Sequence, residues 1–269
     1  SALNLASLTG TDGFRLDGIA ANDRSGFAVS AAGDVNGDGF DDLLIGSPVA
    51  DPNGSLSGSS YVVFGKSAGF PAALNLASLT GTDGFRLDGA ANDRSGRAVS
   101  AAGDVNGDGF DDLLIGAFVA DPNGIASGSS YVVFGKSTGF PAALNLASLT
   151  GTDGFRLDGV AAYDFSGYAV SAGGDVNGDG FDDLLIGAPR ADPNGSYSGS
   201  SYVVFGKNAG FPAALNLASL TGTDGFRLDG VAAEDFSGRA VSAAGDINGD
   251  GFDDLLIGAN GADPNGSGS

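Results

Sequence analysis

A segment of the form D-x-N-G-D-G-F-D-D occurs four times in this chain of 269 residues, and each copy leads directly into an apolar L-L-I-G run. The copies span residues 34–42, 104–112, 175–183 and 246–254, so their starts are 70, 71 and 71 residues apart. Self-similarity at a fixed period is typical of repeat proteins, in which each unit buries its apolar face against its neighbours. We therefore predict four related units, at residues 3–73, 74–143, 144–214 and 215–269.

Side chains that carry oxygen stand at positions 1, 3, 5 and 9 of every copy. Calcium takes six to eight oxygen ligands, and a short loop supplies them when alternate residues turn inward. The glycine at position 6 suits the sharp turn of such a loop, and the main-chain carbonyl at position 7 adds another oxygen. We therefore predict four calcium sites. Their ligands are Asp34, Asn36, Asp38, Phe40 and Asp42; Asp104, Asn106, Asp108, Phe110 and Asp112; Asp175, Asn177, Asp179, Phe181 and Asp183; and Asp246, Asn248, Asp250, Phe252 and Asp254.

Two other interpretations compete with calcium. Asn-Gly and Asp-Gly pairs also build tight turns between strands without any metal. Carboxylates packed into one short loop repel one another, however, and the repetition of that arrangement favours a bound cation. An EF-hand begins with the same pattern but carries a bidentate Glu at position 12, where this chain has Ile in all four copies, so the helical EF-hand is excluded. The acid at position 8, Asp41 in the first copy, is expected to point into solvent.

The chain is acidic, with 33 acidic and 12 basic residues and a formal net charge of -21. Nucleic acids and anionic membranes attract basic proteins, so we expect no nucleic-acid partner. No apolar stretch approaches the ~20 residues that span a bilayer, so we expect no membrane insertion. A hydrophobic content of 42%, with 48 glycines gathered in turn-forming clusters, predicts a folded all-β protein of short strands.

The residue inventory argues against an enzyme. Without His or Cys, the chain cannot assemble a Ser-His-Asp triad, a Cys nucleophile or a His-ligated zinc site. A paired-carboxylate glycosidase needs one acid with a raised pKa in a pocket. Apart from Glu234, the acids here are Asp residues, mostly at repeated positions, which indicates a scaffold. We predict no catalytic activity.

Four strand candidates, named A to D, recur with the repeat, and the first such set comprises residues 28–34, 42–46, 60–65 and 85–88. A unit of about 70 residues is too long for a leucine-rich repeat and suits a propeller blade with an insertion. The blades of a propeller converge at its axis, so the small side chains of A-V-S-A-A-G suit the innermost strand. Apolar L-L-I and Y-V-V-F suit middle strands B and C, and alternating F-R-L-D suits an outer edge strand with Arg and Asp in water. For L-N-L-A-S-L, between C and D, an extra strand, a helical turn and a simple connection stay open.

These units resemble the FG-GAP repeats of the integrin alpha-subunit β-propeller and of related bacterial secreted or surface proteins. The matching residues are S-G-x-A-V-S, D-V-N-G-D-G-F-D-D-L-L-I-G and Y-V-V-F-G, and the resemblance covers nearly the whole chain. It implies a β-propeller of four-stranded antiparallel blades with calcium in the A–B loops. Integrin propellers have seven blades, whereas this chain has four units, the last without a Y-V-V-F-G strand. Further repeats, a ring shared between chains, and a four-bladed ring closed by the strand at residues 14–17 stay open.

The four copies differ mainly in their D–A and B–C connections, which lie at the end of the propeller opposite the A–B loops. Aromatic, Arg and acidic side chains on one rim suit a ligand surface, although exposed loops also vary without function. The integrin resemblance favours this end as the ligand face. Its candidate residues are Asn22, Arg24, Phe27, Asn92, Arg94, Arg97, Tyr163, Phe165, Tyr168, Arg190, Glu234, Phe236 and Arg239.

Calcium sites of modest affinity suit the high calcium concentration outside cells, so we expect an extracellular, secreted or surface protein. The expected function is adhesion or ligand binding, with a protein or a glycan as the ligand. Two alternatives stay open: a structural repeat spacer, and a non-catalytic propeller of a larger extracellular enzyme.

Overall fold

The computed structural model describes residues 4–264 and residue 266. Within them the regular structure is almost entirely β, as predicted, and the helical elements are short 3-10 turns. These turns are η1 (Leu5–Ser7), η2 (Leu76–Ser78), η3 (Leu146–Ser148) and η4 (Leu217–Ser219).

The strands recur in the predicted order, and most of their ends fall within one or two residues of the predicted ones. The A strands are β2 (Ala28–Gly33), β7 (Ala98–Gly103), β12 (Ala169–Gly174) and β17 (Ser237–Gly245). The B strands are β3 (Asp42–Ser47), β8 (Asp112–Ala117), β13 (Asp183–Ala188) and β18 (Asp254–Ala259). The C strands are β4 (Ser59–Val63), β9 (Ser129–Val133) and β14 (Ser200–Val204), and the D strands are β1 (Arg15–Asp17), β6 (Gly84–Asp88), β11 (Gly154–Asp158) and β16 (Gly225–Asp229).

Each complete blade is an antiparallel sheet with its strands in the order A, B, C, D. The first blade comprises β2, β3, β4 and β6, the second β7, β8, β9 and β11, and the third β12, β13, β14 and β16. The fourth blade consists of β17 and β18 among the described residues. The first predicted unit supplies strands A to C of a blade, and strand D comes from the next unit. The outer bounds of the predicted units, residues 3 and 269, lie outside the described residues.

The L-N-L-A-S-L segment is both a strand and a helical turn. Its first part forms β5 (Ala73–Asn75), β10 (Ala143–Asn145) and β15 (Ala214–Asn216), and each continues into a 3-10 turn. The side chain of the Asn before each turn accepts the N–H of the Ala two residues further on. β10 and β15 pair in parallel with the D strands β6 and β11, and β5 pairs in the same way with β1. The prediction that D is the outer edge strand is therefore wrong for these three D strands.

The environment of strand D also differs from the prediction. Phe85 and Leu87 are fully buried, as alternation requires. Asp88 is buried too, although it was expected in water, because the Arg86 guanidinium pairs with it and the Ser59 hydroxyl donates a hydrogen bond to it. The ion pair removes the need for hydration of the carboxylate.

The hydrophobic core lies between successive blades. One cluster joins Leu44, Val62 and Phe85 of the first blade to Ile115 and Tyr131 of the second, and a second cluster repeats the arrangement one blade later. The Phe85 ring stacks on Phe140 with a centroid distance of 4.2 Å, and Phe155 stacks on Phe211 at the same distance. Each blade is therefore stabilised mainly by its neighbours.

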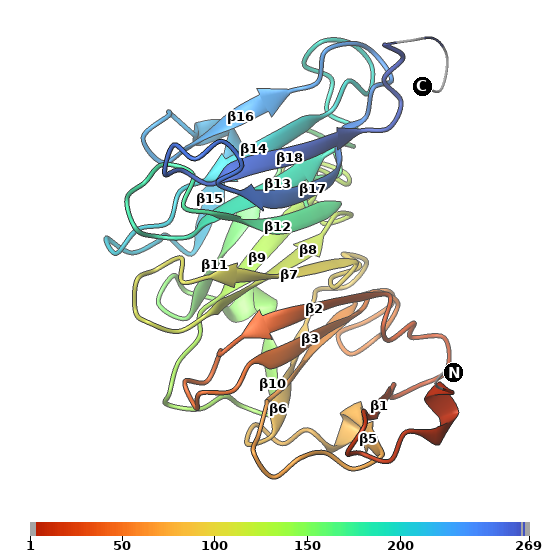
Figure 1. Cartoon of the computed structure of the whole chain (residues 1–269). Helices are drawn as coiled ribbons and strands as arrows, with labels where there is room; N and C mark the ends of the chain where they lie inside the picture. Colours follow the sequence, from red (N-terminus) through yellow and green to blue (C-terminus); the bar gives the residue numbers. More distant parts are fainter. Residues whose placement is uncertain (1–3, 265, 267–269) are drawn as a thin grey trace.

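The blades follow one another along one direction and do not close into a ring (Figure 1). The A strands contact one another in succession, from β2 through β7 and β12 to β17. β2 and β17 lie at opposite ends of the stack, and β1 pairs with β5 instead of completing the fourth blade. The structure is thus an open propeller segment, and the alternative of a closed four-bladed monomer is wrong.

Among the described residues, no helix has the length and apolarity to cross a membrane.

Candidate metal centre and ligand face

The A–B loops hold their carboxylates in place through main-chain hydrogen bonds. In the first loop, Asp34 Oδ1 accepts the N–H groups of Gly37 and Asp38 at 2.8 and 3.0 Å, and Asp34 Oδ2 accepts that of Gly39 at 2.9 Å. Gly37 and Gly39 adopt φ angles of +73° and +87°, a region that favours glycine. The loop therefore wraps its main chain around the first Asp, and the positive φ of Gly39 fits the sharp turn predicted at position 6.

The Asp at position 9 is buried and links the loop to the end of strand C. Asp42 is fully buried, and its carboxylate accepts the N–H groups of Val35 and Gly65 at 3.1 and 2.8 Å. Asp112 makes the corresponding bonds with Val105 and Gly135. Three copies of this contact, including that of Asp183, tie strands A, B and C together at one end of each complete blade.

Burial strongly affects the protonation of these carboxyls. Burial raises the pKa of Asp42 to about 7. The main-chain hydrogen bonds from Gly65 and Val35 lower this pKa, whereas the negative charges of Asp38 and Asp34 raise it further. The same causes raise the pKa of Asp112 to about 8 and that of Asp183 to about 7. A buried carboxylate without a cation thus competes with its protonated form near neutral pH.

The side chains of the described residues do not form a cluster of three or more acids ready to hold a metal ion. The hydrogen bonds accord with this, because Asp34, Asp38 and Asp42 each accept main-chain N–H groups. The chemistry of the predicted ligands still fits calcium, since every side-chain and carbonyl donor is an oxygen and the buried acid at position 9 favours a nearby positive charge.

The prediction that the acid at position 8 stays in solvent is wrong for three of the four loops. Asp41 is exposed, as expected, but Asp111 Oδ2 accepts the N–H of Asp34 in the preceding blade at 2.8 Å. Asp182 and Asp253 make the same bond to Asp104 and Asp175. The position-8 acid therefore joins successive loops.

The phenyl ring at position 7 has a structural role that the sequence did not reveal. The Phe110 ring packs against Gly37 of the preceding loop so closely that a Cβ atom on Gly37 would lie 2.3 Å from it. Phe181 packs on Gly107 in the same way. The predicted main-chain ligand and this packing contact come from the same residue.

The D–A turns of the candidate ligand face have an unusual main chain. Eight of the predicted residues have φ angles between +53° and +74°, which non-glycine residues adopt rarely. These are Asn22, Arg24, Asn92, Arg94, Tyr163, Phe165, Glu234 and Phe236. Main-chain hydrogen bonds to the neighbouring B–C loop, such as Asn92 N–H to Ser55 and Arg94 N–H to Leu56, hold the second, third and fourth of these turns. Backbone strain of this kind is common at binding sites.

Several predicted ligand-face residues meet in a row of alternating cationic and aromatic side chains. The Arg97 guanidinium lies 3.6 Å from the centre of the Tyr168 ring and 5.8 Å from that of Phe27, and Arg239 lies 5.5 Å from Tyr168. Burial, followed by the charge of Arg239, lowers the pKa of Arg97, and the Arg97 side chain also donates to the Tyr168 carbonyl. One side chain from each of four repeats contributes to this row.

A second group lies on the third and fourth repeats. Arg190 sits over the Phe165 and Tyr197 rings at 4.4 and 5.6 Å, and Tyr197 stacks with Phe236 at 5.7 Å. Tyr197 was not predicted as a site residue. The signal was present, because Leu56 and Ala126 stand at the same position of the other B–C loops, so this position also varies among copies.

The FG-GAP repeat family model matches residues 25–63, 95–133, 166–204 and 237–269, which together make up more than half of the chain. The chain is 33% identical over 192 residues to phosphatidylinositol-glycan-specific phospholipase D of Bos taurus. It is 28% identical over 244 residues to integrin alpha pat-2 of Caenorhabditis briggsae and 31% identical over 182 residues to integrin alpha-PS2 of Drosophila melanogaster. These matches cover 66%, 88% and 66% of this chain but 21%, 18% and 12% of the relatives. The chain thus spans about a fifth or less of each relative.

Proposed function

This chain belongs to the FG-GAP repeat family, and from that membership we propose that it is a calcium-stabilised β-propeller module that binds a protein or glycan ligand outside the cell. The observation that carries the calcium part is the buried Asp at position 9, repeated in the first three A–B loops. Each such carboxyl has a raised pKa beside two further loop carboxyls. A divalent cation is the partner that best offsets this accumulation of charge.

In each loop, the side chains at positions 1, 3, 5 and 9 and the carbonyl at position 7 would hold the ion. The first site would comprise Asp34, Asn36, Asp38, Phe40 and Asp42. Calcium supplies positive charge there and favours the ionised form of the buried Asp. Because Asp42 also bonds to Gly65, the loaded loop would fix the end of strand C as well as the A–B hairpin.

For ligand binding, the proposal rests on the opposite rim. Exposed aromatic and Arg side chains stand there on turns with strained main chain, on a scaffold of rigid sheets. Such side chains contribute strongly to binding interfaces. Integrin alpha chains and the phospholipase D are relatives of very different kinds, so the ligand is not carried over from either of them.

Two further functions stay in competition with adhesion. A spacer that separates other domains would need the same calcium loops and no ligand face. A non-catalytic propeller within a larger enzyme accords with the similarity to the phospholipase D. In all three cases we propose that this chain itself catalyses nothing, since it has no His and no Cys.

The calcium proposal is tested by isothermal titration calorimetry on chelator-treated protein. We expect about four calcium ions per chain with affinities of about 10⁻⁴ to 10⁻³ M, as in extracellular modules. A flat titration, together with melting temperatures that do not change on chelation, would rule out calcium.

Ligand binding is tested on protein and glycan arrays, with and without calcium. A binder should give signals that Tyr163→Ala reduces, because this side chain is 53% exposed on the predicted ligand face. Phe40→Ala is the matched control, since Phe40 is an exposed aromatic residue at the calcium end. Silent arrays under both conditions would favour the spacer.

A further inference from the structure

Phe118, in the B–C loop after β8, joins the two side-chain groups of the ligand face into one cluster. Its ring meets those of Tyr168 and Phe165 edge-on, with centroid distances of 5.6 and 5.4 Å. The Arg97 guanidinium lies 5.2 Å from the centre of the Phe118 ring, and that of Arg190 lies 4.4 Å from the centre of the Phe165 ring. Two guanidinium groups therefore flank a patch of aromatic rings. All of these residues belong to the second and third repeats, in the middle of the chain.

The Arg side chains of this chain fall into two classes. One class pairs with the Asp two residues further on in a D strand, and it comprises Arg15, Arg86, Arg156 and Arg227. The other class lies on the rim of the ligand face and forms no ion pair within the described residues; it comprises Arg24, Arg94, Arg97, Arg190 and Arg239. In a chain with a formal net charge of -21, cations that gather on one rim without acidic partners indicate a site for an anion.

Arg97 is partly buried and has no counter-ion. A guanidinium has five N–H donors, and within the described residues Arg97 donates only to the Tyr168 carbonyl, at 2.9 Å. Burial lowers the pKa of Arg97 and the Tyr168 phenol opposes this, so no carboxylate neutralises the guanidinium. A planar group with several open donors fits the two oxygens of a carboxylate.

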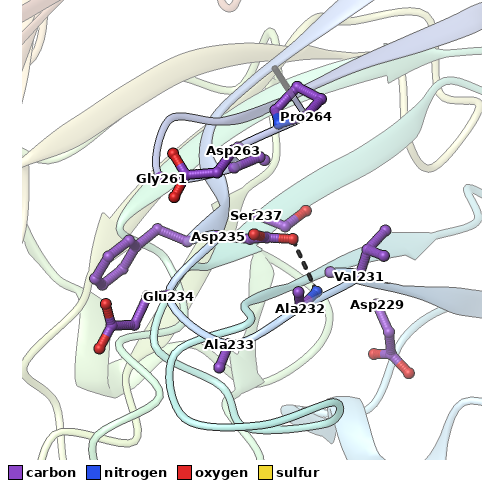
Figure 2. A pocket seen from close by; sticks show the side chains of 14 residues that line it. Asp229, Val231, Ala232, Ala233, Glu234, Asp235, Ser237, Gly261, Asp263 and Pro264 are labelled. Atoms are coloured by element: carbon purple, nitrogen blue, oxygen red, sulfur yellow. Dashed lines mark hydrogen bonds between the residues drawn. The ribbon is translucent and has the colours of Figure 1, made fainter. Parts of the chain in front are cut away.

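Acids of the same rim are held by the main chain of their own turns. Asp164 is buried and accepts the N–H of Ala161 at 2.9 Å. Asp235 accepts the N–H of Ala232 at 2.8 Å, as the dashed line in Figure 2 shows. These carboxylates stabilise the D–A turns and leave the Arg side chains of the cluster open to an acid from another molecule.

The surroundings of the cluster favour one kind of anion. The negative charge of the whole chain repels densely charged polymers such as nucleic acids and sulfated polysaccharides. Guanidinium groups lie over the rings of Tyr168 and Phe165, so they cover ring faces on which a sugar would stack. Arg and aromatic side chains are also enriched in protein–protein interfaces. A peptide with a few spaced acidic side chains fits these conditions best.

We propose that this cluster binds a short acidic segment of a partner protein. Two Asp or Glu side chains of the segment bind Arg97 and Arg190, and an apolar side chain between them packs on Phe118. Each carboxylate accepts N–H groups of one guanidinium, so the hydrogen bonds are charge-assisted. The inference rests on the proposed ligand face and names the chemistry that this face recognises.

The test adds short fluorescent peptides to the full chain. Each peptide carries two Glu, with one, two or three residues between them, one of which is Leu. At least one spacing should give saturable binding in fluorescence anisotropy. The same peptide with Gln in place of both Glu should bind about tenfold more weakly or worse, because hydrogen bonds to charged groups are the strong ones. Equal binding of the Glu and Gln peptides would overturn the proposal.

Variants of the chain locate the site. Arg97→Gln and Arg190→Gln should each weaken binding about tenfold. Phe118→Pro should weaken it too, and it keeps the fold because the first and third repeats carry Pro at this position. Arg24→Gln is the matched control, since it removes the same charge from an exposed Arg of the same rim outside the cluster. Equal losses in all four variants would mean general attraction of charge and no site at the cluster. Circular dichroism spectra must show that the variants are folded.

The array experiment separates this inference from the ligand face itself. If an array ligand depended on Tyr163 but not on Arg97, the ligand face would stand and the acidic segment would be wrong. Silence of the arrays and of every peptide would remove the ligand face as well. A third probe is an oligosaccharide of uronic acids. If it bound more tightly than every peptide and lost binding in Arg97→Gln, the anion would belong to a glycan, which contradicts the peptide proposal.

Discussion

Three Asp residues of one A–B loop differ in their surroundings and in their predicted roles. The exposed Asp38 is a predicted ligand, Asp41 is exposed without a predicted role, and Asp42 is buried beneath the loop. All three carry the same chemical group. Their different surroundings allow metal binding to be separated from simple loss of charge.

Asp38→Ala should remove one of about four calcium ions, because it deletes a predicted ligand at position 5. Asp41→Ala removes the same charge from the same loop but no predicted ligand, so it should leave the number of ions unchanged. Calorimetric titration of both variants measures the difference. The ligand assignment fails if the two variants lose calcium equally.

Asp93 provides a pH-dependent contribution to stability away from the A–B loops. Burial, with the charge of Asp121 adding to it, raises the pKa of Asp93 to about 6 from an ordinary value of 3.8. Between these two values the folded chain binds more protons at this site than the unfolded chain. The stability contributed by Asp93 is therefore greatest below its ordinary pKa and is lost as the pH rises through about 6.

Asp93→Asn should therefore reduce the fall in the free energy of unfolding between about pH 3 and about pH 7, which lie roughly one pH unit outside the range from 3.8 to about 6. Urea unfolding at the two pH values measures this fall. Asp51→Asn is the control, since that Asp is exposed. If the free energy of unfolding of Asp93→Asn changed with pH as it does in the wild type, Asp93 would not be a source of this pH dependence.

At the scale of elements, the junction between blades depends on groups that belong to different repeats. Asp111 accepts the Asp34 N–H, and the Phe110 ring covers Gly37. Each contact joins residues more than seventy positions apart. The junction is therefore sensitive to single side chains of the loop.

Asp111→Ala should destabilise the fold by about 1–3 kcal/mol, the usual cost of leaving a partly buried donor without its acceptor. Asp41→Ala, at the same position of the first loop, removes an exposed side chain and should change stability little. Urea unfolding of the two variants in saturating calcium compares them. Equal midpoints would show that the inter-blade bond contributes nothing measurable.

The sequence was sufficient to predict the strands, because turn residues bound them and a short apolar run or a period of two marks them locally. Strands 42–47 and 84–88, for example, lie within a residue of their predicted bounds. The roles of Asp111 and Asp88 could not be predicted in this way. Each depends on a partner in another strand or blade, and a repeat pattern alone does not show which surfaces meet. The parallel pairing of β10 with β6 was missed for the same reason.

At the scale of the whole molecule, blades contact mainly their neighbours, while the charge is shared by all of them. The chain has a formal net charge of -21, so its excess carboxylates repel one another in the folded state. Salt screens the repulsion between exposed charges over the whole surface. A calcium ion would instead act locally, in the loops where several carboxylates lie together. These two effects predict different responses to added ions.

Chelation should lower the melting temperature strongly, and calcium should restore it more effectively than sodium chloride of equal ionic strength. Each filled site stabilises the folded chain by about 2.7 kcal/mol when calcium is a hundredfold above its Kd. Magnesium should restore less, because it demands octahedral geometry and gives up its water reluctantly. Calorimetric melting in the four conditions separates these effects. If sodium chloride alone restored the full melting temperature, screening would account for the stabilisation, and the A–B loops would be turns that need no metal.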